Sequence, residues 1–238
     1  MKKIILSTAI LLALFSCKTE TKETPETTPV VSTEEVAEEE RTPEQEVAYK
    51  IAEANGLDQW DQVSEVQFTF NVDRGEEHYE KSWIWKPKTQ DITQMTAQDT
   101  ITYNRSSVDS TSTAADKGFI NDSFWLLAPM HLVWDKESSN LTVQDTATAP
   151  ISKKKLHKIT LTYGDEGGYT PGDAYDFFYD DEFMVREWIF RRGNVSEFSM
   201  VTTWDDYEDY NGIKIASDHK TEDKNFRLYF TDIAVKTE

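Results

Sequence analysis

The side chains that most often bind metal ions are scattered along this sequence. Histidine occurs only four times, at widely separated positions: His78, His131, His157 and His219. None of them falls into the HxH or HExxH spacing that brings two imidazoles to one ion, and no cysteine accompanies them. A zinc site would need ligands from several distant segments, so we expect no metal.

Two acidic runs could instead offer oxygen ligands to calcium. In GDAYDFFYDDE, residues 172–182, Asp176 and Asp180 would lie about 13 Å apart on one strand face, because a strand rises about 3.3 Å per residue. The Asp-Asp pair that follows has the composition of a turn between two strands. DDYEDYNG, residues 205–212, ends in an Asn-Gly hairpin signal. We interpret both runs as solvent-facing acids near turns.

Motifs for nucleophilic or nucleotide chemistry are absent. The sequence has no GxSxG, no GxGxxG and no P-loop, so it indicates neither a serine nucleophile nor a bound nucleotide. Aspartate and glutamate together number 44, so two carboxylates can meet anywhere and their spacing selects no acid–base pair. We expect no enzyme activity and no cofactor.

The only cysteine, Cys17, stands where an apolar run meets a polar one. Lys2 and Lys3 precede residues 4–15, which are almost wholly apolar, and Ser16 is small. A basic start, an apolar core and a small residue before the cleavage point are typical of an export signal. The run is shorter than the roughly 20 apolar residues that span a bilayer. LFSC, at the end of this segment, resembles the lipobox of bacterial lipoproteins.

Lipidation of Cys17 would explain why the sequence contains a single cysteine. A lone thiol in an exported protein cannot form an internal disulfide. Acyl chains such as palmitate contribute about 0.8 kcal/mol for each buried CH₂, so several chains attach a protein permanently. The alternative is a plain secretory signal with a chance cysteine. We expect residues 1–16 to be a lipoprotein signal peptide and Cys17 to bind the membrane through its lipid.

Charge and composition separate a tether from a folded domain. The net charge of −19 argues against nucleic acid as a partner. Residues 17–41 consist largely of threonine, glutamate and proline, which bury little, and we interpret them as a disordered acidic stalk. A short amphipathic helix is predicted to follow the stalk. It starts with a capping box formed by Thr42 and Gln45, with Pro43 in the first helical position, and it ends at Asn55-Gly56.

After this helix, the spacing of apolar residues changes from that of a helix to the alternation of a strand. In VQFTFNV, residues 66–72, apolar and polar side chains alternate as in a strand buried on one face. Similar runs follow at short spacing: 78–86, 100–104, 140–144, 156–163, 174–180, 183–191, 197–204, 212–217 and 226–235. About ten strands without long helices between them indicate an antiparallel meander. We expect residues 42–238 to form one domain.

One segment breaks the β pattern. Residues 117–134, KGFINDSFWLLAPMHLVW, are apolar on more than one side of any helix they could form. Asn121 or Asp122 would cap a short helix through Leu127, and Pro129 would stop it. Such a helix must lie inside a concave sheet or meet another apolar surface. The patterns therefore indicate an α+β, mainly β fold class: an antiparallel sheet of about ten strands with an N-terminal helix and a short apolar helix that a curved sheet could cover.

Aromatic side chains make up 12% of the residues, and they supply the candidate ligand site. Core packing explains most of them. In SWIWK and REWIFRR, however, both faces of the strand are apolar, so half-exposed rings could line a cup. The predicted lining residues are Trp83, Trp85, Phe124, Trp125, Leu127, Met130, Trp188 and Phe190. The basic runs 153–155 and 191–192 could meet a phosphate or carboxylate head group.

Four pieces together resemble one family: ANGLDQW with VSEVQFTF, FINDSFWLLAPMHL, YDFFYDDEFMVREWIFRRG, and TWDDYEDYNGIKIASDHKT before FRLYFTDIAV. They are similar to uncharacterised Bacteroidota lipoproteins related to the LolA/LolB lipoprotein-carrier superfamily, and the resemblance covers nearly all of residues 43–238. It implies an open half-barrel around short helices, with a cavity for acyl chains. LolB-type carriers also use an exposed apolar loop, for which Trp134 and residues 167–172 are the candidates.

These observations lead to one functional hypothesis and one alternative. The first is a lipoprotein of the cell envelope, anchored in the outer membrane on its periplasmic or surface side, that binds an apolar or amphiphilic small molecule such as a lipid or acyl chain. The second is a surface module with a filled core that binds a glycan or a protein. The sequence names no protein partner and does not identify the ligand.

Overall fold

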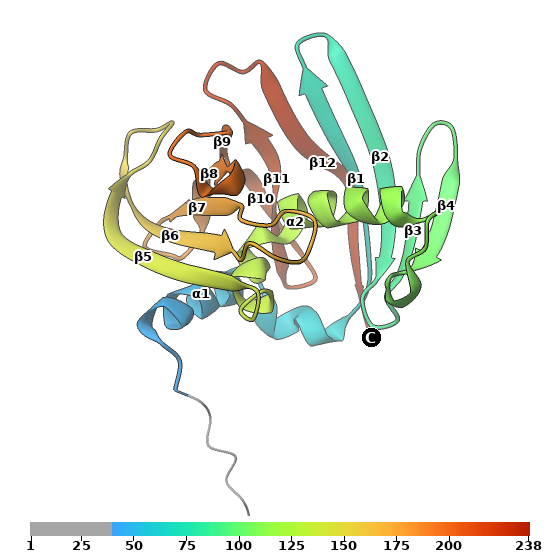
Figure 1. Cartoon of the computed structure of the whole chain (residues 1–238), viewed down its shortest axis with the longest axis horizontal. Helices are drawn as coiled ribbons and strands as arrows, with labels where there is room; N and C mark the ends of the chain where they lie inside the picture. Colours follow the sequence, from blue (N-terminus) through green and yellow to red (C-terminus); the bar gives the residue numbers. More distant parts are fainter. Residues whose placement is uncertain (1–39) are drawn as a thin grey trace, which may run out of the picture. The chain divides into compact units, whose positions relative to one another are not determined.

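The computed structural model describes residues 40–238 (Figure 1). The predicted signal peptide, Cys17 and nearly all of the predicted stalk lie outside the described residues, so those assignments stay predictions. Residues Glu40–Glu238 form one compact unit. No helix in this part of the chain is both long and apolar enough to cross a membrane.

Helix α1 (Pro43–Ala54) begins and ends where the sequence predicts. The Thr42 hydroxyl accepts a hydrogen bond from the Gln45 backbone N–H, and the Gln45 side chain accepts one from the Thr42 N–H, at 3.3 and 2.9 Å. Gly56 follows the helix with φ of +98°, and a Cβ there would lie 2.0 Å from the Gly212 carbonyl oxygen. Glycine is required because the helix end presses against the turn that contains Gly212.

Twelve strands form two antiparallel sheets. The seven-stranded sheet has the order β10-β11-β12-β1-β2-β3-β4, and the five-stranded sheet has the order β5-β6-β7-β8-β9. The bounds are β1 Val63–Arg74, β2 Glu77–Lys86, β3 Asp91–Met95, β4 Thr100–Asn104, β5 Ser139–Thr148, β6 Lys155–Tyr163, β7 Ala174–Tyr179, β8 Val185–Arg191, β9 Met200–Thr203, β10 Asp205–Tyr210, β11 Ile213–Lys220 and β12 Phe226–Thr237.

The strand pattern confirms the predicted open, mainly antiparallel β fold, with two differences. All ten predicted segments contain strands, but β3 and β10 are additional. β3 is only five residues long, and the sequence of β10, DDYEDY, is too acidic to show an alternating pattern. The strands also form two curved sheets rather than one: the chain changes sheet through α2 between β4 and β5, and changes back at Trp204, the single residue between β9 and β10.

Helix α2 (Thr113–Trp134) is longer than the predicted helix. Ser112 is its N-cap, so neither Asn121 nor Asp122 caps it. Pro129 lies inside the helix, where it lacks the N–H that would bond to the preceding turn. Leu127 absorbs the irregularity with non-helical angles, φ −129° and ψ 25°. The helical conformation is thus interrupted at Leu127, where the sequence predicts the helix to end, but it resumes through Trp134; Pro129 does not stop it, because a proline in the first turn of the resumed segment needs no N–H donor there.

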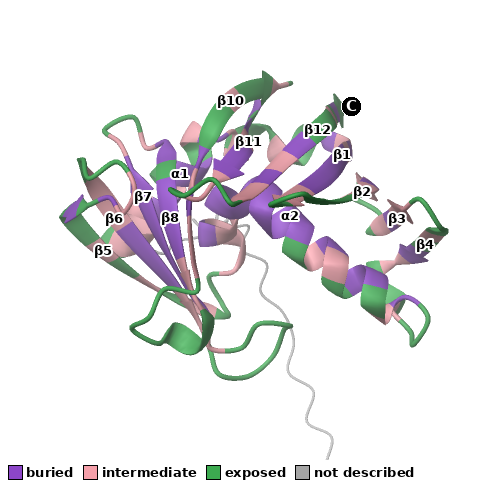
Figure 2. Ribbon diagram, turned by 90° about the horizontal axis from the view of Figure 1, so that it is seen from above, coloured by how far each residue is buried: buried purple, intermediate pink, exposed green. Residues whose placement is uncertain are grey.

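Helix α2 lies between the two sheets, across the concave side of the seven-stranded sheet (Figures 1 and 2). Its N-terminal half alternates between buried and exposed residues, whereas its C-terminal half is buried nearly all round (Figure 2). One hydrophobic cluster includes side chains of both helices and of both sheets. The sheets themselves meet where the Thr203 hydroxyl of β9 accepts a hydrogen bond of 3.2 Å from the Lys220 N–H of β11.

Candidate functional site

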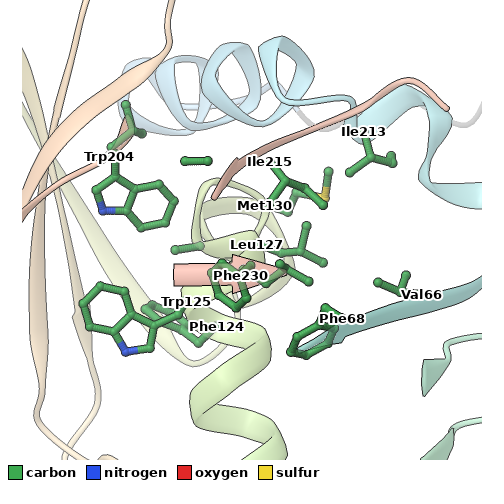
Figure 3. Packing of buried hydrophobic residues seen from close by; sticks show 14 of the residues in the cluster. Val66, Phe68, Phe124, Trp125, Leu127, Met130, Trp204, Ile213, Ile215 and Phe230 are labelled. Atoms are coloured by element: carbon green, nitrogen blue, oxygen red, sulfur yellow. The ribbon is translucent and has the colours of Figure 1, made fainter. Parts of the chain in front are cut away.

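The interior where α2 passes between the sheets is the candidate site, because most of the predicted lining residues lie there. Phe124, Trp125, Leu127 and Met130 extend from α2 into this interior, and Phe230 comes from β12 (Figure 3). Each of them is less than a tenth exposed. A helix with side chains buried on all its faces requires cover from both sheets, and it has that cover here.

Aromatic rings of the five-stranded sheet complete this interior. The ring centroids of Trp125 and Trp188 lie 4.2 Å apart. Phe124 approaches Tyr175 of β7 at 4.7 Å, and Tyr175 stacks on Phe190 of β8 at 5.0 Å. Distances of this size fit the offset and edge-to-face contacts that aromatic rings prefer. The interior is therefore a continuous aromatic layer whose rings pack on one another.

Four buried polar atoms in this layer have no hydrogen-bond partner within residues 40–238: Trp188 Nε1, Thr202 Oγ1, Trp204 Nε1 and His219 Nε2. They belong to one neighbourhood, because Trp204 lies 5.5 Å from Trp188 and 4.5 Å from His219 between ring centroids, and Thr202 pairs with Trp188 across β8 and β9. A buried polar atom without a partner costs about 1–3 kcal/mol. The junction of the sheets is therefore the least satisfied part of the core.

His219 is held neutral at this junction. Burial lowers the pKa of its imidazole to about 4. Its Nδ1 donates a hydrogen bond of 3.2 Å to the Thr203 carbonyl oxygen, so Nε2 is left as an acceptor. The junction thus offers one acceptor, the two indole N–H donors and one hydroxyl to whatever polar group enters it.

The other end of α2 is fixed to the seven-stranded sheet by a buried ion pair. Asp122 is fully buried, and its Oδ2 accepts hydrogen bonds from Lys81 Nζ at 2.9 Å and from Trp83 Nε1 at 2.8 Å. Burial raises the pKa of the Asp122 carboxyl, and the charge of Lys81 opposes that rise. The rings of Trp83 and Trp85 also pack on Phe119 of α2, at 5.5 and 5.3 Å.

A second buried carboxylate joins α2 to a loop of the other sheet. Asp116 Oδ1 accepts hydrogen bonds from the Tyr103 hydroxyl of β4 at 3.2 Å and from Arg105 Nε at 3.1 Å. Its Oδ2 accepts one of 2.8 Å from the hydroxyl of Tyr169, in the loop between β6 and β7. Tyr169 is half-exposed, so this contact is the outermost link between the five-stranded sheet and the N-terminal half of α2.

Replacing Tyr169 with phenylalanine is expected to loosen this link without unfolding the protein. The variant loses one hydrogen bond at a half-exposed position, so the free energy of unfolding falls by less than about 1.5 kcal/mol. Amide hydrogen exchange of residues 113–119 should become faster, because opening of that region no longer breaks the bond to Asp116. Tyr79→Phe, at another exposed tyrosine, is the matched control. Unchanged exchange in Tyr169→Phe would contradict this role.

All eight predicted lining residues belong to the same hydrophobic cluster, in two groups. Trp83 and Trp85 lie with Phe119 at the N-terminal half of α2. Phe124, Trp125, Trp188 and Phe190 belong to the aromatic layer around Tyr175, and Leu127 and Met130 extend from α2 into the same interior (Figure 3). Six of the eight are less than a tenth exposed, whereas Trp85 and Phe190 are half-buried. In the described part of the chain, these side chains pack on one another.

Sequence reasoning missed the polar residues of the site. The sequence offers Asp122 only as one of two candidate helix caps and Tyr169 only as part of the candidate loop 167–172, and it predicts no role for Lys81 or Asp116. One signal existed: Asp122 is a single acid between Ile120 and Phe124 in an apolar run. A carboxylate at such a position must be paired when the helix is buried. Within residues 40–238, no group of three or more His, Cys, Asp or Glu side chains is arranged to hold a metal ion.

Comparison with solved structures identifies the fold. A LolA superfamily protein from Nitrosomonas europaea aligns with a TM-score of 0.50 over 83% of this chain and 96% of that chain, at 9% identity. This chain has a LolA-like fold. A DUF1329 family protein from Desulfovibrio piger has a TM-score of 0.47, with 10% identity over 82% of this chain and 94% of that chain.

Among the other similar structures is a putative outer membrane lipoprotein-sorting protein domain from Vibrio parahaemolyticus. Its TM-score is also 0.47, with 9% identity over 81% of this chain and 92% of that chain. The sequence itself matches no protein-family model and no curated protein. The similarity therefore concerns the LolA-like fold, and the function has to be argued from the interior of this chain.

Proposed function

We propose that this protein is a lipoprotein of the cell envelope that binds an apolar or amphiphilic molecule, such as a lipid or an acyl chain, between its two sheets. Its lipidated Cys17 would hold it in the outer membrane, and the acidic stalk would give the folded unit reach. The single observation that carries the proposal is the aromatic interior around α2, with four unpartnered polar atoms at the junction of the sheets.

The chemistry of the junction supports an amphiphilic guest. A hydrocarbon chain that replaced contacts of Trp125 or Leu127 would stay in an apolar environment and lose little free energy. An ester or hydroxyl group of the same molecule would give Trp188 Nε1 and Trp204 Nε1 the acceptor that they lack. The hydrogen bonds formed by such a molecule would thus offset part of the free energy that is lost when the packed side chains separate.

Binding requires α2 to move, because its side chains fill the interior. The helix is irregular where it crosses the junction, with Leu127 outside helical angles and Pro129 lacking a backbone donor. Irregular points of this kind are where helices bend. The segment from Leu127 to Trp134 can therefore shift without breaking a complete ladder of hydrogen bonds, while Asp122 keeps the N-terminal half on the sheet.

Photo-crosslinking in cells tests the ligand. The full chain is expressed in a Gram-negative bacterium fed with a diazirine-bearing fatty acid, irradiated and digested with trypsin. The α2 peptide, residues 118–136, lies between Lys117 and Lys136 and is expected to carry the lipid. Labelling confined to other peptides, or no labelling above that of an unrelated lipoprotein, would overturn the proposal. Native mass spectrometry of protein released without added lipid gives the ligand's mass.

The anchor is tested separately by Cys17→Ser. The variant should move from the membrane fraction to the soluble fraction and should lose the mass of its acyl chains, because the serine hydroxyl does not replace the lipidated thiol. Ser16→Ala keeps a small residue before the cysteine and is the control, which should remain membrane-bound. Membrane association of Cys17→Ser equal to that of the original chain would exclude a lipid anchor at this residue.

A further inference from the structure

A hollow of about 490 Å³ lies away from α2, on the opposite face of the five-stranded sheet. Its floor is formed by β5 to β8, and its rim is the loop after β8. The lining residues are Gln144, Ala147, Thr148, Lys158, Asp176, Phe178, Ile189, Arg191, Ser196 and Phe198. Its volume falls in the range of about 300–1,000 Å³ that is usual for small-molecule sites. Alternation along β7 separates this face from the interior, because Phe177 points to the core while Asp176 and Phe178 line the hollow.

A buried carboxylate organises the floor of the hollow. Asp176 is 3% exposed, and its Oδ1 accepts a hydrogen bond of 2.6 Å from the Thr160 hydroxyl. Arg191 donates to Oδ2 through Nη1, and its Nη2 donates to Asn194 Oδ1 at 3.1 Å. Lys158 Nζ lies 4.0 Å from Asp176 Oδ1. One buried negative charge is therefore shared by two cations.

The hollow has more donors than acceptors. Among residues 40–238, Lys158 Nζ donates no hydrogen bond, and its ion-pair contact with Asp176 is 4.0 Å long. Arg191 uses two of its five N–H groups. Glu187, on the same face of β8, is already occupied, because its two oxygens accept from the Ile151 and Ser152 N–H groups at 2.6 and 2.9 Å. Free donors on partly buried cations favour an anionic ligand group.

Apolar side chains surround this charged floor. Phe178, Ile189 and Ala147 are buried beside it and form a small hydrophobic cluster of their own. Phe198, on the rim, is 60% exposed and is one of four large hydrophobic side chains that the described residues leave exposed. Val195, on the same loop, is another. A ligand with an apolar part would bury Phe198, which gains about 25 cal/mol for each Å² removed from water.

We propose that this hollow is a second binding site, which holds a small amphiphile whose carboxylate or phosphate contacts Lys158 and Arg191 and whose apolar part lies against Phe178, Ile189 and Phe198. The site is independent of the interior around α2. The loop of residues 192–199 forms its cover, and Gly193, with φ of +59°, gives the turn at the base of that loop the left-handed conformation that it needs.

Calorimetric titration of the full chain carrying Cys17→Ser tests the charge requirement. The probes are octanoate, octyl phosphate, octanol, octyltrimethylammonium and inorganic phosphate. Octanoate and octyl phosphate are expected to bind at least tenfold more tightly than octanol or the cation. Inorganic phosphate tests whether the site needs the apolar part of the ligand or binds any phosphate. We expect inorganic phosphate to bind at least tenfold more weakly than octyl phosphate. Equal binding of octanol and octanoate, or of inorganic and octyl phosphate, would overturn the proposal.

Two variants locate the binding. Lys158→Gln should weaken octyl phosphate binding about tenfold and leave octanol binding unchanged, with Lys214→Gln, at the exposed position of β11, as control. Phe198→Ser, at an exposed position that folding does not need, should weaken octyl phosphate about fivefold, with Tyr79→Ser as control. If neither variant weakens octyl phosphate, the ligand binds elsewhere and the second site is refuted. The interior site is judged independently, by labelling of the α2 peptide.

Discussion

Replacing Lys81 with methionine is expected to lower the free energy of unfolding by about 3–5 kcal/mol at pH 7. The substitution keeps the length and apolar stem of the side chain, but it leaves the fully buried Asp122 without a counterion. An uncompensated buried charge is among the most costly single defects in a protein core. Urea unfolding monitored by tryptophan fluorescence measures the loss, and the chain has seven tryptophans to report it.

The loss should depend on pH in a defined direction. Burial already raises the pKa of Asp122 above its ordinary value of 3.8, and removal of Lys81 raises it further. The folded state of the variant therefore binds a proton more readily than its unfolded state, so its deficit relative to the original chain shrinks as the pH falls toward the raised pKa. A deficit that is constant from pH 7 to pH 4.5 would contradict a charged Asp122.

Two further variants separate the charge from side-chain packing. Lys86→Met, at the exposed end of the same strand, should change stability by less than about 0.5 kcal/mol. The double variant Lys81→Met with Asp122→Leu should recover much of the loss, because apolar side chains replace both charges together. If the double variant is as unstable as Lys81→Met alone, the defect lies in packing and not in the orphaned carboxylate.

Two tryptophan-to-phenylalanine substitutions should differ markedly in cost, although both indoles are almost completely buried. Trp83 Nε1 donates to Asp122, whereas Trp188 Nε1 has no partner. Trp83→Phe removes a hydrogen bond to a charged group, worth about 1.5–3 kcal/mol, and also loses packing volume. Trp188→Phe loses similar volume but removes an unsatisfied donor, which offsets part of the loss.

We therefore expect Trp83→Phe to destabilise the protein by about 2 kcal/mol more than Trp188→Phe. Urea unfolding of each variant measures the difference, and far-UV circular dichroism checks that both keep the native fold. Equal costs would mean that the Trp188 indole N–H is satisfied, for example by a buried water molecule or a retained ligand. Native mass spectrometry of the original chain then distinguishes these two.

Much of the fold was predictable because its signals are local. The capping box at Thr42 and Gln45 and the glycine at position 56 determine where the 12-residue helix α1 begins and ends. The alternation in β1 and the turn at Asn211-Gly212 likewise need only neighbouring residues, and both were predicted. β10 was missed because its acids hide the alternation, and its strand conformation depends on pairing with β11, as Tyr207↔Ala216 shows.

The candidate site was predictable only in its apolar part. The sequence predicts Trp125, Leu127 and Met130 as the lining of a ligand cup; their apolar character accounts for their place in the interior, where they are buried in one packed cluster. The partners of Asp122 are about 40 positions earlier, on β2, and one of the three partners of Asp116, Tyr169, is in a loop 53 positions later. No spacing rule connects such positions, because only the packing of α2 against β2 and against the loop between β6 and β7 brings them together.

That corner at Trp204 gives the molecule a geometric advantage. β5 lies four strands away from β9, which at about 4.8 Å per strand is a lever arm of about 19 Å. A rotation of about 10° where β9 meets β10 displaces β5 by about 3 Å while the strands nearest the pivot scarcely move. A twist between β9 and β10 would therefore move the far edge of the five-stranded sheet more than the strands next to Trp204.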